Sequence, residues 1–268
     1  MTLHERVNAF SPGIKNWFTR HWYQYLAGLP HAEDLLFMNY GYTSETHPQP
    51  GLDPADEPYR LCIQLYHHTV AETPLAGKQV LEVGSGRGGG ASYLARYRQP
   101  AQYTGLDFAP RAVAFCRKYH KASNLNFMTG TALQIPFADN SLDAVLNVES
   151  SHTYLSFAVF CREVFRVLKP GCWFLFTDLR DTDKAEAART DLLQPGFTIA
   201  EEEDISREVL RAMELDHERK CRLIAAKTPF FLHTTLRQFA GTRESKVYTG
   251  LADGSVRYLR FKLQKPVK

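Results

Sequence analysis

The glycine-rich stretch VLEVGSGRGGG, from Val80 to Gly90, limits the fold of this chain more than any other feature. An apolar run typical of a buried strand leads into glycines at positions 84, 86 and 88, and a helical pattern follows them. Glycine adopts backbone conformations that other residues avoid, and it lets a ligand approach the main chain closely. The pattern predicts a strand, a tight turn and a helix, with a ligand against the turn.

Short apolar runs alternate with helical patterns from Leu75 onward, which predicts a parallel sheet with helices on both faces. The predicted strands are residues 78–84, 102–108, 125–130, 142–149, 172–179 and 197–203, and the predicted helices between them are 91–99, 110–122 and 157–169. Residues 205–239 are predicted to be mainly helical, and the turn ADG to join two final strands, 245–251 and 255–265. Ligands of such sheets bind beyond the carboxyl ends of the strands.

Differences in composition and predicted secondary structure divide the chain into four regions. Residues 1–58 are rich in aromatic side chains, of which Phe18, Trp22 and Tyr25 share one face of a predicted helix, and we expect them to form a lid. Residues 59–204 form the predicted core. A helical insertion at 205–242 is expected over the substrate pocket, and strands within 243–268 are expected to complete the sheet.

Bulk composition narrows the possible partners and compartments. The net charge of +3 with no basic stripe argues against nucleic acid. Five scattered cysteines without a CxxC pair suggest neither a zinc site nor disulfides, which favours a reducing compartment. The first residues lack the apolar core of a signal peptide, and no stretch reaches the roughly 20 apolar residues that span a bilayer. We therefore expect a cytoplasmic protein without an integral membrane segment.

The glycine turn alone fits two kinds of cofactor. Gly84, Gly86 and Gly89 satisfy the GxGxxG pattern of dinucleotide-binding folds, and Asp107 lies 21 residues after Gly86. Glu82, however, ends the strand just before the turn, where a carboxylate would repel a pyrophosphate but attract an ammonium group. The segments GTALQIPF, DNSLDAV and VFRVLKPG further along the chain decide between the two.

Together the motifs LEVGSGRGG, GLDF, GTALQIPF, DNSLDAV and VFRVLKPG resemble those of class I S-adenosylmethionine-dependent methyltransferases, over about Leu75 to Asp178. The resemblance implies an α/β fold of the Rossmann-like, doubly wound type. Its sheet would be mostly parallel and seven-stranded, with an antiparallel terminal strand and a helical lid. The implied cofactor is S-adenosylmethionine.

The resemblance also implies roles for particular residues in binding the cofactor. Glu82, Gly84, Ser85 and Gly86 would line the methionine portion, Asp107 would hold both ribose hydroxyls, and Phe108 would lie on the adenine face. Thr131 stands where the family commonly has an acidic residue that bonds the adenine amino group, so anchoring there would be weaker. The further expected cofactor contacts are Ala132, Asn147 and Tyr40, the last because an aromatic face attracts a sulfonium cation.

The end of the fourth predicted strand carries the candidate base. Methyl transfer to an alcohol benefits from a group that removes the hydroxyl proton during attack, and histidine has a suitable pKa. His152 lies in NVESSHTY after that strand, and Asp178 closes the next strand, where its carboxylate would orient the imidazole. The pair resembles the His–Asp dyad of sugar and polyketide O-methyltransferases. A structural, backbone-capping His152 is the alternative, and no metal site is expected.

The acceptor is inferred from resemblance. FMNYGYTSE, NVESSHTY and TDLR resemble bacterial enzymes that methylate hydroxyls of lipid-like and polyketide products, such as mycobacterial phthiotriolone and glycolipid O-methyltransferases. They imply a small, hydrophobic acceptor, and a homodimer is possible. The alternatives are C- or N-methylation, or another reaction that uses the same cofactor.

Overall fold

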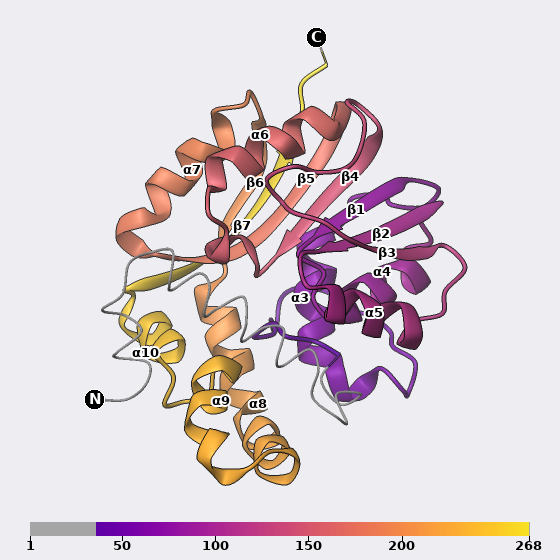
Figure 1. The fold of residues 1–268 in the computed structure, drawn as a ribbon. Helices are drawn as coiled ribbons and strands as arrows, with labels where there is room; N and C mark the ends of the chain where they lie inside the picture. Colours follow the sequence, from indigo (N-terminus) through magenta and orange to yellow (C-terminus); the bar gives the residue numbers. More distant parts are fainter. Residues whose placement is uncertain (1–35, 268) are drawn as a thin grey trace.

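The computed structural model describes residues 36–267, which form a central sheet with helices on both faces (Figure 1). The predicted lid helix in residues 1–35 lies outside the described residues. The strands are β1 (Gln79–Val83), β2 (Gln102–Asp107), β3 (Leu125–Thr129), β4 (Leu142–Val148), β5 (Leu168–Asp181), β6 (Thr198–Asp204) and β7 (Val256–Gln264). The helices are α3 (Arg60–Val70), α4 (Gly89–Tyr97), α5 (Pro110–Tyr119), α6 (Phe157–Val167), α7 (Ala185–Leu193), α8 (Ser206–Lys227), α9 (His233–Ala240) and α10 (Lys246–Asp253).

The sheet has seven strands in the order β3-β2-β1-β4-β5-β7-β6, and β7 runs antiparallel to both of its neighbours. The predicted fold class is therefore confirmed. After β1 the chain winds outward through β2 and β3 and then returns to place β4 beside β1. A crevice for a ligand forms at this reversal, at the carboxyl ends of β1 and β4.

Successive side chains of each strand point to opposite faces of the sheet, where they pack into two separate core clusters. Val80 and Leu146 face a cluster that contains α3, α4, α5 and α8 side chains, while Leu81 and Val145 face a second cluster under α6 and α7. Both faces are covered, which explains why β1 and β4 read as nearly continuous apolar runs.

The prediction of a strand at residues 245–251 was wrong, since Lys246–Asp253 form helix α10. Ser245 caps this helix by accepting a hydrogen bond from the Tyr248 N–H, and Gly254, with φ of 79°, ends it. Leu251 is buried, and Val247 and Tyr248 pack against the same core cluster. Positions 247, 248 and 251 lie on one face of a helix, whereas in a strand they would lie on both faces. Of the two predicted final strands, only β7 therefore joins the sheet. The helical prediction for residues 205–239 is confirmed by α8 and α9.

Gly90, in the first turn of α4, packs so closely against α3 that alanine is expected to destabilise the fold. Alanine usually favours a helix over glycine by about 1 kcal/mol. Here its Cβ would stand 1.9 Å from Cζ of Tyr66, whose hydroxyl is fixed by Glu82. We expect Gly90→Ala to lower the free energy of unfolding in urea by about 1–3 kcal/mol. Gly51→Ala, where a Cβ meets nothing within 4 Å, is the control. Equal stability of the two variants would contradict this packing.

None of the helices within residues 36–267 has the length and apolar character that crossing a bilayer requires.

Candidate active site

A cavity lies at the carboxyl ends of β1, β2 and β4, at the reversal of the strand order. Its walls come from the glycine turn, the end of β2, the segment after β4, and residues 36–40, which precede α3. Of the predicted site residues, those that line it are Tyr40, Gly84, Ser85, Gly86, Asp107, Phe108 and His152. The structure thus brings together most of the residues predicted from separate motifs.

The glycine turn has the backbone conformation that its sequence predicts. Gly84 and Gly86 have φ of 82° and 53°, in the region that side chains disfavour. A Cβ on Gly84 would stand 2.3 Å from Oγ of Ser150, so even a methyl group would displace the segment after β4. Ser85 lines the cavity, and its buried Oγ has no hydrogen-bond partner within residues 36–267.

Asp107 ends β2 and presents a buried carboxylate to the cavity. Its Oδ2 accepts a hydrogen bond from the Gly86 N–H and its Oδ1 from the Ala109 N–H, both at 2.8 Å. These bonds fix the carboxylate against the glycine turn. Burial raises the pKa of Asp107 to about 6, although the two N–H groups act in the opposite direction. Further donors, such as the two hydroxyls of a ribose, would stabilise its charged form.

Glu82 lies behind the cavity wall. The Tyr66 hydroxyl donates to its Oε1 at 2.7 Å and the Tyr103 hydroxyl to its Oε2 at 3.0 Å. The side chain is fully buried, and burial raises its pKa to about 7 despite the two hydroxyls. Tyr66, which lines the cavity, separates this carboxylate from the space where a ligand would sit.

Three other predicted cofactor contacts lie outside the cavity lining. Thr131 is exposed, and its Oγ1 accepts a hydrogen bond from the Leu133 N–H at 3.2 Å. Ala132 is half-buried against the core under α6. Asn147 is fully buried, and its Nδ2 donates to the Val83 carbonyl at 2.8 Å. It therefore ties the end of β4 to the end of β1.

The segment from Leu36 to Tyr40 covers the glycine turn. The Leu36 carbonyl accepts a hydrogen bond from the Gly89 N–H at 3.1 Å, and the Tyr40 N–H donates to Oε2 of Glu149 at 2.9 Å. Tyr40 lines the cavity. The structure gives the position of this ring and leaves its role as a proposal.

Glu149 fastens that segment to the sheet. Its Oε2 also accepts a hydrogen bond from the Tyr258 hydroxyl of β7 at 2.6 Å, and its backbone has φ of 50°, which is uncommon for a residue other than glycine. Burial raises the pKa of Glu149 to about 7, against the lowering effect of its two donors. This bond from strand end to covering segment was not predicted.

His152 and Asp178 form a hydrogen-bonded pair beside the cavity, which His152 lines. Because β4 and β5 are parallel neighbours, with Val148 opposite Thr177, His152 after the end of β4 lies close to Asp178, the residue after Thr177. The prediction that Asp178 closes its strand was wrong, since β5 continues to Asp181 beside β7. His152 Nδ1 lies 2.8 Å from Asp178 Oδ1, and the His152 N–H donates to Oδ2 of the same carboxylate at 2.9 Å. The Asp178 side chain is fully buried, while the His152 side chain is 29% exposed and lines the cavity. The predicted juxtaposition is therefore present.

The electrostatics of the pair favour a charged imidazole. Burial lowers the pKa of His152, but the charge of Asp178 and its hydrogen bond together raise it above its ordinary value of 6.5. Burial would raise the pKa of Asp178, yet the neighbouring His152 and Arg180 hold it well below its usual range. Asp178 therefore stays ionised when the imidazole takes up a proton.

Arg180 and Ser151 complete the surroundings of Asp178. Arg180 Nη1 lies 3.1 Å from Asp178 Oδ2, and its Nη2 donates to Oγ of Ser151 at 2.6 Å. Ser151 in turn donates to Asp178 Oδ2 at 2.6 Å. The structure places the Arg180 side chain beside Asp178, where it is only 10% exposed.

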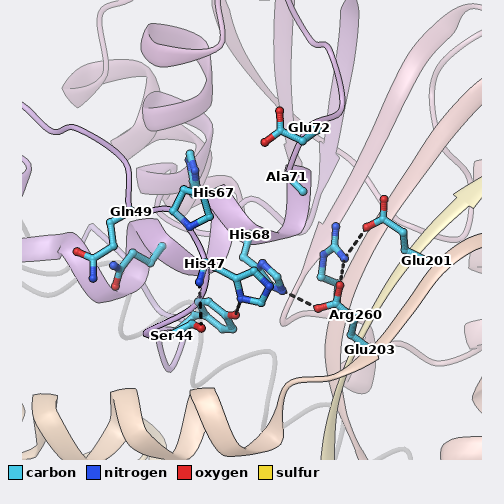
Figure 2. Close-up of a pocket in the computed structure, with 13 residues that line it drawn as sticks. Ser44, His47, Gln49, His67, His68, Ala71, Glu72, Glu201, Glu203 and Arg260 are labelled. Carbon is cyan, nitrogen blue, oxygen red and sulfur yellow. Dashed lines mark hydrogen bonds and ion pairs between the residues drawn. The ribbon is translucent and has the colours of Figure 1, made fainter.

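A second cavity, between α3 and the edge formed by β6 and β7, contains none of the predicted catalytic or cofactor residues (Figure 2). The buried Arg260 donates through Nη1 to both Glu201 and Glu203, and His68 Nε2 lies 2.8 Å from Glu203. Tyr42 lies here and stacks on His68 with ring centroids 4.4 Å apart. These contacts tie α3 to the sheet edge.

Several lining residues were not among the predicted catalytic and cofactor-binding residues. Tyr66, Arg87, Glu149, Tyr154 and Phe239 come from separate segments and meet only in the folded chain. Of these residues, only Glu149 and Tyr154 belong to NVESSHTY, the segment at the end of the fourth predicted strand. Within residues 36–267, no group of three or more His, Cys, Asp or Glu side chains is arranged to hold a metal ion.

Comparison with known proteins identifies the kind of domain. Residues 81–176, which contain the glycine turn, Asp107 and the His152 segment, match a family model described as a methyltransferase domain. The chain is 38% identical over 239 residues to the phthiotriol/phenolphthiotriol dimycocerosates methyltransferase of Mycobacterium tuberculosis, covering 89% of this chain and 88% of the relative. It is 39% identical over 246 residues to a fatty-acid O-methyltransferase of Mycolicibacterium smegmatis, covering 92% and 89%.

A solved structure confirms the fold. A putative sarcosine dimethylglycine methyltransferase from Galdieria sulphuraria matches with a TM-score of 0.72 at 15% identity, over 92% of this chain and 98% of that one. At this level of identity the likeness concerns the arrangement of the sheet and helices alone.

Proposed function

Because the chain belongs to the class I S-adenosylmethionine-dependent methyltransferases and is of the mycobacterial lipid and fatty-acid O-methyltransferase type, we propose that it methylates a hydroxyl of a small hydrophobic acceptor, with His152 as general base. One observation carries the proposal. His152 is held by a buried, ionised carboxylate through Nδ1, while its Nε2 has no partner among the described residues and its ring lines the cavity.

The cavity has the groups that this cofactor needs. Asp107 offers a buried carboxylate for the ribose, the Gly84–Gly86 backbone allows close approach, and Ser85 Oγ has no hydrogen-bond partner among the described residues. Phe108 lines the same wall and supplies an apolar surface for a flat base. When bound, S-adenosylmethionine would supply a methyl group on a positively charged sulfur, and the sulfur would leave as a neutral thioether when a nucleophile takes the methyl carbon.

The chain's own residues then have distinct tasks. Asp178 accepts the Nδ1–H of His152, so that Nε2 is the atom left to accept a proton from the acceptor hydroxyl. The protonated imidazole is stabilised by the ionised Asp178, which Arg180 and Ser151 hold in place. Tyr40 and Glu149 keep the covering segment closed, which limits the entry of water.

The apolar lining supports a hydrophobic acceptor. Phe37, Met38, Tyr40, Val148 and Phe239 contribute apolar side chains to the cavity. The relatives with about two fifths of their residues in common are named for a phthiotriol lipid and for fatty acids. A hydroxylated lipid or polyketide-like molecule is therefore the acceptor class that we propose.

Transfer to a long-chain secondary alcohol, followed across pH, tests this function. We expect a methyl ether, and a rate that rises with pH through a midpoint above 6.5, because His152 must be neutral to accept a proton and Asp178 raises its pKa. In Asp178→Asn the carboxylate charge is lost while burial still lowers the pKa of His152. The midpoint should therefore move to lower pH, with a lower maximal rate. A methylated carbon or nitrogen, a product formed without methyl transfer, or an unchanged midpoint in Asp178→Asn would contradict the proposal.

A further inference from the structure

The tip of the hairpin formed by α8 and α9 exposes two adjacent aromatic side chains. Phe230 is 83% exposed and Phe231 is 70% exposed, and their rings meet edge to face with centroids 5.9 Å apart. The hairpin projects away from the sheet, at the lower end of the molecule in Figure 1. Single exposed apolar residues are ordinary, but a pair of aromatic rings at a projecting tip indicates a surface that binds something apolar.

Hydrogen bonds hold the tip in this shape. The Leu232 N–H donates to the Pro229 carbonyl at 3.0 Å, and His233 Nε2 lies 3.0 Å from the Thr228 carbonyl. Phe230 and Phe231 belong to the 3-10 turn that these bonds enclose. Their outward position therefore belongs to an ordered turn of the fold.

The surroundings of the tip are strongly basic. Residues 219–243 contain six Lys or Arg and no Asp or Glu, whereas the whole chain has a net charge of +3. Arg219 and Lys220 are paired with Asp216, which precedes them in α8, and Arg243 is paired with Glu214 of the same helix. Arg222 and Lys227, on the last turns of α8 before the aromatic pair, are exposed. Positive charge is thus concentrated beside the two rings, which suits a negatively charged surface.

An apolar path joins the tip to the active-site cavity. Leu232 and Leu236 pack with Ile224 of α8 in a small cluster, which also contains Phe239. Phe239, near the end of α9, lines the cavity beside the covering segment. The helix that begins just after the tip therefore ends at the site.

We propose that this tip docks on an anionic lipid bilayer. Phe230 and Phe231 insert at the level of the acyl-chain boundary, and Arg222 and Lys227 face the phosphate headgroups. The binding is peripheral, since the insertion involves one turn of chain. It needs neither cofactor nor acceptor, so it stands apart from the proposed reaction. With that reaction, the apolar path gives a membrane-dissolved acceptor a short route to His152.

Sedimentation of the full chain with vesicles tests the proposal. Large vesicles of phosphatidylcholine with phosphatidylglycerol are compared with vesicles of phosphatidylcholine alone, without cofactor. We expect binding to the anionic vesicles that weakens with salt, and a loss of at least about 10-fold in partitioning for the double variant Phe230→Ala/Phe231→Ala. Arg222→Gln and Lys227→Gln should each weaken it by about 5-fold. Tyr119→Ala, at an exposed aromatic on α5, is the matched control and should bind like the unaltered chain.

Two further measurements distinguish a loss of membrane binding from a loss of folding and test the insertion of the tip directly. The melting temperature and the affinity for S-adenosylhomocysteine should be unchanged in the double variant, because both rings are exposed. In Phe231→Trp, the added fluorescence should shift to the blue on anionic vesicles and be quenched by brominated lipid. Equal binding to both kinds of vesicle, retention of binding by the double variant, or absence of quenching would overturn the proposal. So would a dimer that the double variant converts to a monomer in sedimentation velocity, since a second copy would then cover the tip.

Discussion

Replacing His152 with alanine is expected to lower kcat for a long-chain alcohol by about 10²–10⁴-fold, the usual contribution of a general base. The affinity for S-adenosylhomocysteine should change little, because the imidazole contacts Asp178 and the open side of the cavity. The residual rate should also lose its rise with pH near neutrality. Steady-state kinetics with the alcohol measures kcat, and calorimetry measures the affinity for S-adenosylhomocysteine.

A second acceptor makes this result specific. A fatty acid is already ionised at neutral pH, since carboxyl groups have pKa values of about 4, so its methylation needs no base. We therefore expect His152→Ala to slow ester formation by less than about 10-fold, a small loss beside that for the alcohol. His47→Ala, at the second cavity, is the matched control and should leave both rates unchanged. An equal loss for the two acceptors would indicate that His152 positions the acceptor or supports the fold, and would contradict its role as a base.

The second large effect is expected at Asp107. Asp107→Ala should weaken the binding of S-adenosylhomocysteine by about 10²–10⁴-fold, because hydrogen bonds to a charged group contribute about 1.5–3 kcal/mol each and two ribose hydroxyls would lose theirs. In the unaltered chain the affinity should also fall as the pH drops through about 6, where burial places the pKa of this carboxyl. The ligand binds the ionised form of Asp107, so the affinity is lost as this carboxylate is protonated. Calorimetry across pH measures both effects.

Thr131 provides the contrasting variant. The resemblance predicts a contact between Thr131 and the adenine, but the structure leaves this side chain exposed and outside the cavity lining. We expect Thr131→Ala to change the affinity by less than about 3-fold, as for a surface substitution. Since Asp107 also bonds the glycine turn, the melting temperature of Asp107→Ala has to be recorded beside its affinity. Comparable losses in Asp107→Ala and Thr131→Ala would contradict the position of the ribose and adenine that we infer.

Local patterns predict most of the sheet. The runs ending at Gly84, Phe108 and Glu149 are apolar on both faces, as strands buried between helices are, and the structure has β1, β2 and β4 there. The His152–Asp178 pair was predictable as well, because β4 and β5 are parallel neighbours, His152 follows the end of β4, and Asp178 lies in the carboxyl-terminal part of β5. These features depend on residues close in the chain and on one general rule of topology.

What the sequence did not indicate depends on distant side chains. Glu82 stands at the predicted strand end, but Tyr66 and Tyr103 take up both of its oxygens, and neither tyrosine belongs to a recognisable motif. The bond from Glu149 to Tyr258 joins positions 109 residues apart. Residues 245–251 alternate apolar and polar weakly enough to suit either kind of element, and the cap at Ser245 with packing on the core makes them helical.

A crystal structure of the chain with S-adenosylhomocysteine tests the central claim most directly. The account predicts the ligand in the crevice at the ends of β1, β2 and β4, with its ribose hydroxyls on Asp107 and its sulfur on the side of the cavity that His152 lines. Density for the ligand between α3 and the β6–β7 edge, or a ribose bonded elsewhere than to Asp107, would contradict it.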